Sequence, residues 1–198
     1  VGGGPIGLEL AQAHRRLGAR VTVMEMMRFM PRDDEELSQI VADRLRAESI
    51  TLLGGAQVQA VAKEGDEIRL DVEIDGQAQQ ITGSHLLVAA GRVPNLDLGL
   101  EAAGVERTRR GLKVDSRLRT SNKKIYAVGD VAGGAQFTHV ASYHAGIALR
   151  NILFRLPART TKQVIPWVTY TDPELAHVGM LEQEARAKFG RVSGVRWP

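Results

Sequence analysis

The stretch that decides the fold is Gly2-Gly3-Gly4-Pro5-Ile6-Gly7, which lies at the start of the 198-residue chain. Its glycines satisfy the G-x-G-x-x-G pattern of dinucleotide-binding turns. In that pattern Gly2 permits the tight turn, Gly4 lets a pyrophosphate approach the backbone, and Gly7 lets the next helix pack closely on the sheet. The free N–H groups of the helix N-terminus then face the phosphates. Because glycines also mark ordinary loops, the pattern needs support from its surroundings.

The residues that follow supply this support. Apolar spacing predicts a helix over 6–17, with Gly18 at its end, and then a short buried strand over 21–25. Glu25 lies 18 positions after Gly7, close to the expected spacing of about 20. A carboxylate there accepts hydrogen bonds from the ribose 2′-OH and repels a 2′-phosphate, which favours NAD. NADP stays the alternative, because Arg28 and Arg32 lie near Glu25 in the sequence.

A second helix is predicted over 33–48. Its apolar stripe contains Leu37, Ile40, Val41 and Leu45, and Asp33 with Glu36 resembles a capping box. A third short strand over 51–53 completes a β-α-β-α-β order, for which Val1 is expected to be the last residue of a severed first strand.

Further along, the hydrophobic period changes from helical to alternating. Apolar and charged residues alternate over 68–74, and Asp75-Gly76 is a type I′ hairpin signal. An antiparallel meander is therefore expected after the parallel strands. The remaining predicted elements are a returning strand over 78–82, apolar strands over 86–90, 125–128 and 164–170, and helices over 137–154 and 181–189.

Composition excludes several classes of protein. The chain has no cysteine, so it holds no disulfide, thiolate metal site or cysteine nucleophile. A net charge of +3 without a basic stripe argues against nucleic acid as a partner, and the apolar runs are too short to span a membrane. His139 and His144 are five residues apart and do not share a helix face, so no metal site is predicted.

Four blocks in order resemble the pyridine nucleotide–disulfide oxidoreductases, the FAD-dependent family of lipoamide dehydrogenase, mercuric reductase and glutathione reductase. The blocks are Gly2 to Glu9, Leu87 to Asn95, Thr120 to Asp130, and Ile165 to Met180. The first two are similar to the family's NAD fingerprint and its GRxPN junction. The last two are similar to its second FAD motif and the opening of its dimerisation domain. The lipoamide dehydrogenase and mercuric reductase types are favoured, because Met26 stands where the glutathione reductase type has an NADP-binding arginine.

The resemblance implies a fold and three domains. The fold is α/β: a Rossmann-type NAD-binding domain with a parallel sheet plus an antiparallel meander, a piece of the FAD domain, and the start of an α+β dimerisation domain. The implied ranges are 1–115 for the NAD(P)-binding domain, 116–157 for the C-terminal piece of the FAD domain, and 158–198 for the beginning of the dimerisation domain. The cofactors are FAD and NAD, and a cytoplasmic homodimer is expected.

The resemblance also implies site residues. Glu9 matches the acid beside the nicotinamide carboxamide, Val58 a residue on the adenine side of NAD, and Asp130 the acid that hydrogen-bonds the FAD ribityl chain. The remaining expected cofactor contacts are Pro5 and Ile6 at the nicotinamide, Gly91 in the same cleft, and Gln136, Phe137, Thr138 and His139 at a helix start aimed at the flavin.

The parent enzyme is expected to pass hydride from NADH to FAD and on to a disulfide or similar acceptor. The family's redox cysteine pair and its catalytic His-Glu pair fall outside the matched blocks, so this chain alone is expected to be inactive and to contain no catalytic residue. Two alternatives stay open. One is an NADH oxidase or soluble transhydrogenase without the redox disulfide, and the other is a non-catalytic module that senses NAD.

Overall fold

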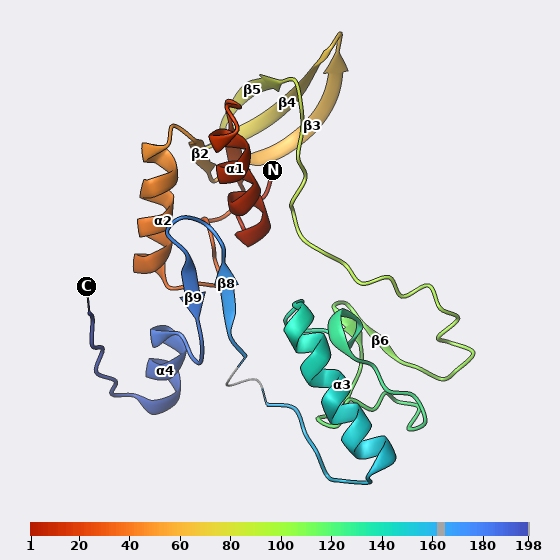
Figure 1. Cartoon of the computed structure of the whole chain (residues 1–198). Helices are drawn as coiled ribbons and strands as arrows, with labels where there is room; N and C mark the ends of the chain where they lie inside the picture. Colours follow the sequence, from red (N-terminus) through yellow and green to blue (C-terminus); the bar gives the residue numbers. More distant parts are fainter. Residues whose placement is uncertain (162–164, 198) are drawn as a thin grey trace. The chain divides into compact units, whose positions relative to one another are not determined.

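The computed structural model describes residues 1–161 and 165–197, which form two compact units (Figure 1). The first unit consists of Val1–Gly91 and Val168–Pro198, and the second of Arg92–Trp167.

The first unit contains a small parallel layer. Strand β1 (Thr22–Glu25) pairs in parallel with β2 (Thr51–Gly54). On the other side of β1, the Gly2 amide donates to the Met24 carbonyl at 2.8 Å. The Val1 nitrogen donates to the Leu87 carbonyl and the Ala89 amide donates to the Val1 carbonyl, both at 2.7 Å. The strand predicted over 86–90 is therefore wrong as a regular strand. Among the described residues, the two hydrogen bonds to Val1 are too few to form a ladder.

Two helices accompany the parallel strands. Helix α1 (Pro5–Arg16) starts with proline at its first position, and α2 (Glu35–Ala47) follows β1. The N-cap of α2 is Asp34, whose carboxylate accepts from the Glu36 amide at 3.0 Å and from the Leu37 amide at 3.3 Å. The predicted cap, Asp33, is wrong by one residue, because Asp33 lies before the cap and is 2% exposed.

The buried face of α2 also differs from the predicted stripe. Val41 and Leu45 are buried as expected, together with Ser38 and Ala42. Leu37 and Ile40 are 45% and 53% exposed. The inward face thus follows i, i+3, i+4, i+7 from Ser38, and Ile40 does not widen it.

Three antiparallel strands form the meander, in the order β3-β4-β5. Strands β4 (Glu67–Ile74) and β5 (Gln77–Gly83) are joined by Asp75 at φ 51° and Gly76 at φ 75°, as a type I′ turn requires. The first strand, β3 (Gln57–Glu64), was not predicted.

Two neighbouring residues of β1 show how the layers stack. Val23 belongs to the core cluster that contains Leu8 of α1 and Leu45 of α2. Met24 belongs to the cluster that contains Leu70 and Val72 of β4. Since successive strand residues point to opposite faces, the parallel strands lie between the helices and the meander. The predicted α/β class is confirmed.

The C-terminal segment adds strands β8 (Trp167–Thr169) and β9 (Leu175–His177), which pair, and helix α4 (Glu182–Phe189). Leu175 is 4% exposed and joins the core cluster of Leu8 and Val41. The strand predicted over 164–170 is shorter than expected, and its first residue, Val164, lies outside the described residues.

The second unit has its own small core of Leu100, Val105, Leu112 and Ala127. Its elements are β6 (Arg107–Thr108), β7 (Gly111–Leu112), the 3-10 helix η1 (Gly129–Ala132) and helix α3 (Thr138–Leu153). The strand predicted over 125–128 is wrong, because this segment forms only an isolated bridge between Tyr126 and Arg119. Within the described ranges, no helix combines the length and apolar character needed to cross a membrane.

Candidate functional site

The glycine turn has two crowded positions and one open position. At Gly7, an added Cβ would lie 1.9 Å from the Gly2 carbonyl oxygen. At Gly2, where φ is 109°, it would lie 2.4 Å from the Ala89 oxygen. At Gly4, no atom lies within 4 Å of such a Cβ. Gly2 and Gly7 therefore permit close packing of the backbone, whereas Gly4 leaves open space at the start of α1.

The N-terminus of α1 is suited to an anion. Gly4 is its N-cap, no side chain caps it, and its first turn contains no acidic residue. Helix α2 is the opposite, because Asp34 caps it and Glu35 and Glu36 occupy its first turn. The partial positive charge of α2 is thus met by its own carboxylates, while that of α1 remains available to a phosphate.

Glu25 is held in place by the turn itself. Its Oε2 accepts from the Gly3 amide at 2.7 Å, and its Oε1 accepts from the Met27 amide at 2.9 Å. Each carboxylate oxygen retains further acceptor capacity. The carboxylate at the end of β1 is therefore fixed beside the glycine turn, as the fingerprint requires.

The loop after Glu25 folds back onto the turn. The Met30 amide donates to the Gly3 carbonyl at 2.9 Å, and Met30 is fully buried. Phe29, 9% exposed, occupies the space that a side chain at Gly3 would need. The Arg28 guanidinium donates to the Asp33 carbonyl at 2.7 Å, so this arginine is tied to its own loop.

One turn further along α1, Glu9 contacts the C-terminal segment. Its Oε1 accepts from the Tyr170 amide at 2.8 Å. Pro5 is half-buried and Ile6 is 54% exposed, so the start of the helix presents apolar surface.

The remaining predicted residues of the first unit lie on β3 and after the meander. Val58 is half-buried and packs against the core cluster of Met24 and Val72. Gly91 is exposed, has φ 125°, and has open space where a side chain would point.

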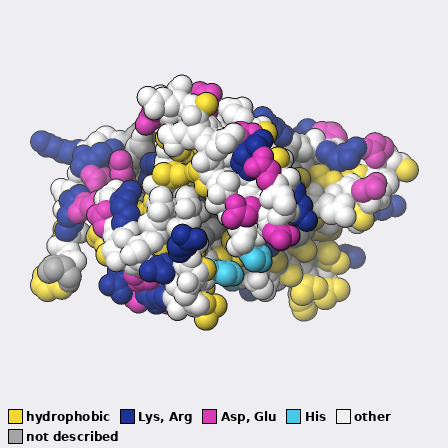
Figure 2. Space-filling model, turned by 90° about the horizontal axis from the view of Figure 1, so that it is seen from above, with side chains coloured by type: hydrophobic (Ala, Val, Ile, Leu, Met, Phe, Trp, Pro, Cys, Tyr) yellow, Lys and Arg dark blue, Asp and Glu magenta, His cyan; other side chains and the backbone are white. Residues whose placement is uncertain are grey.

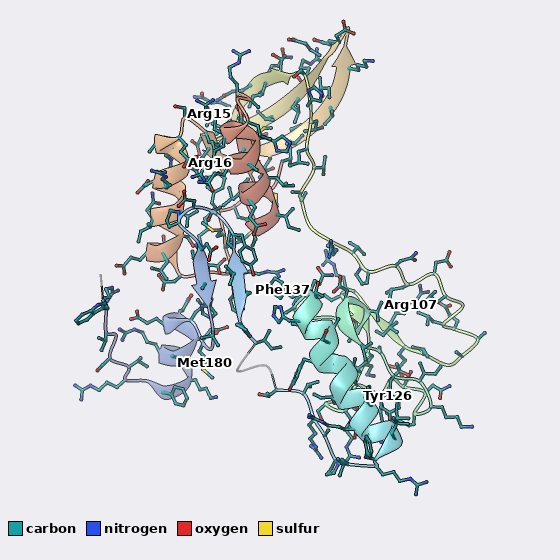
Figure 3. All side chains as sticks on the ribbon, viewed as in Figure 1. Arg15, Arg16, Arg107, Tyr126, Phe137 and Met180 are labelled. Carbon is teal, nitrogen blue, oxygen red and sulfur yellow. The ribbon has the colours of Figure 1, made fainter. Side chains whose placement is uncertain are left out.

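The second unit holds the predicted flavin contacts. Asp130 lies in η1, with its Oδ2 3.6 Å from Nη1 of Arg92, and its side chain is 34% exposed. Phe137 is the N-cap of α3 (labelled in Figure 3), and no side chain closes this helix end with a hydrogen bond. The ring of Phe137 stacks on the ring of His139, with their centroids 5.3 Å apart. Gln136 donates to the Arg92 carbonyl at 3.4 Å, while Thr138 begins α3 and is exposed. Asp130 and Gln136 are thus both joined to Arg92.

A buried histidine supports η1. The Gly129 amide donates to Nδ1 of His144 at 3.2 Å, and His144 is 8% exposed. Because an amide can only donate, Nδ1 carries a lone pair and the ring is neutral with its hydrogen on Nε2. Burial lowers the pKa of His144 from its ordinary value of 6.5.

Acidification is therefore expected to destabilise the turn that presents Asp130. With the folded pKa of His144 below 6.5, the unfolded chain binds more protons as the pH falls, so stability is lost from about pH 6.5 downwards. His144→Asn, which retains an acceptor near Nδ1, should reduce this loss between about pH 7 and pH 5. The measurement is the thermal midpoint of unfolding, followed by circular dichroism, at each pH. His14→Asn serves as the control, since His14 is exposed and bonds only within α1, to the Leu10 carbonyl. An unchanged pH dependence in His144→Asn would contradict the assignment.

Surface charges are interspersed. Figure 2 shows Lys and Arg side chains beside Asp and Glu side chains on the visible face. Ion pairs also join Lys113 with Glu106 and Arg119 with Asp115. Among residues 1–161 and 165–197, no three His, Cys, Asp or Glu side chains are grouped to hold a metal ion.

Residues 1–145 match the family model described as pyridine nucleotide-disulphide oxidoreductase. The chain belongs to this family. The match includes both the glycine turn and η1. The predicted family is confirmed, and its members use FAD together with NAD or NADP.

Relatives of this family member are reductases and dehydrogenases. A mercuric reductase of Bacillus cereus is 40% identical over 191 residues, which are 95% of this chain and 30% of that protein. A dihydrolipoyl dehydrogenase of Chlorobaculum parvum is 38% identical over 195 residues, which are 97% of this chain and 42% of that protein. Mercuric reductases and lipoamide dehydrogenases are the two types that the sequence analysis favoured from the presence of Met26.

A solved structure shows the same fold. The HOCl-induced flavoprotein disulfide reductase RclA from Escherichia coli, as a Cu(II) complex, gives a TM-score of 0.85 at 31% identity. The alignment covers 94% of this chain and 43% of RclA. The family member described here thus spans less than half the length of these relatives.

Three contacts of the site were not predicted. They are the Tyr170 amide on Glu9, the Gln12 side chain on Asp172, and His144 on Gly129. The first two join residues about 160 positions apart, for which the sequence carries no local signal. The burial of His144 in the third contact could have been predicted, because His144 lies on the inward face of a predicted helix.

Proposed function

We propose that the full-length protein is an FAD-dependent oxidoreductase that takes hydride from NADH and passes the electrons to a disulfide or similar acceptor. The observation that carries this proposal is the glycine turn, in which Gly4 is open, α1 is uncapped, and Glu25 is fixed by two amides. Family membership supports the choice of FAD as the second cofactor. A homodimer in the cytoplasm and the division into domains 1–115, 116–157 and 158–198 are part of the same proposal.

The residues present fit NAD. The α1 N-terminus would hold the pyrophosphate over Gly4, and Glu25 would accept from the adenosine ribose. Glu9 would receive the carboxamide of the nicotinamide, with Pro5 and Ile6 beneath the ring. Val58 and Gly91 would line the adenine side and the cleft.

The residues of the second unit fit FAD in the same sense. Asp130 would accept a hydrogen bond from the ribityl chain. Gln136, Phe137, Thr138 and His139 surround the uncapped start of α3, whose partial positive charge would stabilise negative charge on a flavin ring. When bound, the nicotinamide would supply a hydride and the flavin would accept it.

The choice of NADH over NADPH is the test of the first site. Glu25→Gln keeps one acceptor oxygen for the Gly3 or Met27 amide and removes the charge that repels a 2′-phosphate. We expect the ratio of NADPH to NADH dissociation constants to fall about tenfold, equivalent to about 1.4 kcal/mol. The measurement is flavin bleaching by each nucleotide in the full-length, FAD-loaded protein without oxygen.

The matched control is Glu35→Gln, which removes an exposed carboxylate from the first turn of α2. It is expected to leave the ratio unchanged. An unchanged ratio in Glu25→Gln would remove Glu25 from the site. Bleaching without reduction of a disulfide, but with rapid oxygen consumption in air, would favour the oxidase alternative.

A further inference from the structure

We propose that Gln12 is a positioning residue for the nicotinamide end of the dinucleotide, acting through the 170–172 turn and Glu9. This inference rests on the proposed function, because it assumes that Glu9 receives the carboxamide. All residues involved belong to the first unit.

The Gln12 side chain hydrogen-bonds both the amide and the carbonyl of Asp172. Its Oε1 accepts from the Asp172 amide at 2.8 Å, and its Nε2 donates to the Asp172 carbonyl at 2.9 Å. The same Nε2 donates to Glu48 at 3.1 Å. The Gln12 side chain uses its acceptor and both donor hydrogens, and the residue is 4% exposed. A buried amide that is fully paired in this way fixes the turn in one position.

The 170–172 turn also fixes Glu9. Tyr170 lies two residues before Asp172, and its amide donates to Oε1 of Glu9 at 2.8 Å. Glu9 and Gln12 are three positions apart on α1, so they project from the same side of the helix. The bond to Tyr170 occupies one oxygen of Glu9 and leaves the other to receive a donor from a ligand.

Arg16 contacts the side chain of Asp172 at the surface. Its Nη2 lies 2.7 Å from both Glu48 and the Asp172 carboxylate, and its side chain is 45% exposed. Figure 3 labels Arg16 on α1. The hydrogen bond from Arg16 lowers the pKa of Glu48 to about 2, so Glu48 stays charged and keeps accepting from Gln12 across the physiological range. Unlike Gln12, Arg16 has no hydrogen bond to the backbone of the turn among the contacts found in the described chain.

The experiment compares two ligands of the full-length, FAD-loaded protein. NADH would use both Glu25 and Glu9, whereas ADP-ribose lacks the nicotinamide and would use only the glycine turn and Glu25. In Gln12→Met, which keeps the volume and removes the three hydrogen bonds, we expect the dissociation constant of NADH to rise about tenfold. That of ADP-ribose should stay within about twofold of the wild-type value. The rate of flavin bleaching at saturating NADH should fall as well, because a mobile carboxamide samples fewer productive orientations.

Arg16→Met is the matched control, since it loses contacts to Glu48 and Asp172 but leaves the turn backbone held. Its NADH affinity should change less than about twofold, because Gln12 still holds the Asp172 backbone and Arg44 still pairs with Glu48. Gln12→Asn, whose shorter amide keeps the polarity of the site but does not reach the Asp172 backbone as Gln12 does, is the second variant if Gln12→Met does not fold. It should show the same NADH-selective loss.

A double-mutant cycle tests the route through Glu9. If Gln12 acts through Glu9, adding Gln12→Met to Glu9→Ala should cost no further NADH affinity. Equal losses for NADH and ADP-ribose, no loss for either, or additive effects with Glu9→Ala would overturn the proposal. Failure of the proposed function is distinguishable, because the wild-type protein would then bind neither ligand.

Discussion

Gly7→Ala is expected to prevent stable folding of the first unit, whereas Gly4→Ala is expected to leave folding intact and weaken NADH binding. The methyl group at Gly7 would lie 1.9 Å from the Gly2 oxygen, and both groups are backbone-bound, so neither can turn aside. Separating α1 from the turn should cost about 3 kcal/mol or more. Urea unfolding followed by circular dichroism, together with the soluble yield, measures this loss.

The substitution at Gly4 has the opposite profile. Gly4 has φ −81° and ψ −179°, which alanine adopts freely, and no atom lies within 4 Å of the added methyl. The free energy of unfolding should fall by about 1 kcal/mol, because alanine is a poorer N-cap than glycine. The methyl would occupy the space proposed for the pyrophosphate, so NADH affinity should fall between about tenfold and a hundredfold. A Gly4→Ala protein that binds NADH normally would exclude this turn as the dinucleotide site.

Asp130→Ala is expected to release flavin from the full-length protein. A charge-assisted hydrogen bond to a ribityl hydroxyl contributes about 1.5–3 kcal/mol, so FAD should bind about tenfold to a hundredfold more weakly. The measurement is the ratio of flavin to protein absorbance after dialysis.

Two further variants separate the hydrogen bond from its surroundings. Asp130→Asn keeps an acceptor and should retain more flavin than Asp130→Ala. Arg92→Ala removes the exposed partner at 3.6 Å and should change retention little, because such a pair contributes less than about 1 kcal/mol. Full flavin retention in Asp130→Ala would remove this residue from the site.

Sequence patterns predicted best those elements that bury one face along their whole length, because their apolar residues then recur regularly. Strand β4 is the middle strand of the meander, and its alternation from Ile68 to Ile74 was clear. Strand β3 lies at the edge and buries little of its surface, so Gln57–Glu64 shows no comparable alternation. The capping error has a local cause too, since Asp33 and Asp34 are adjacent and have equal intrinsic preference for the N-cap.

The candidate site divides in the same way. The glycine turn and Glu25 could be predicted because a short motif encodes their geometry. The contacts of Gln12 and Tyr170 could not, because they depend on the C-terminal segment packing against α1. His144 could be placed on a helix, but its partner Gly129 depends on how α3 packs on η1.

The loop after Glu25 has a consequence for the entropy of ligand binding. Ordering a backbone costs about 1–2 kcal/mol per residue at room temperature. Phe29 and Met30 hold this loop against the turn, and Arg28 ties the loop to itself, through contacts of the chain alone. Its conformational entropy is therefore lost when the chain folds. A dinucleotide that binds at the turn meets a rigid receptor, and its contacts contribute to affinity without first having to order the loop.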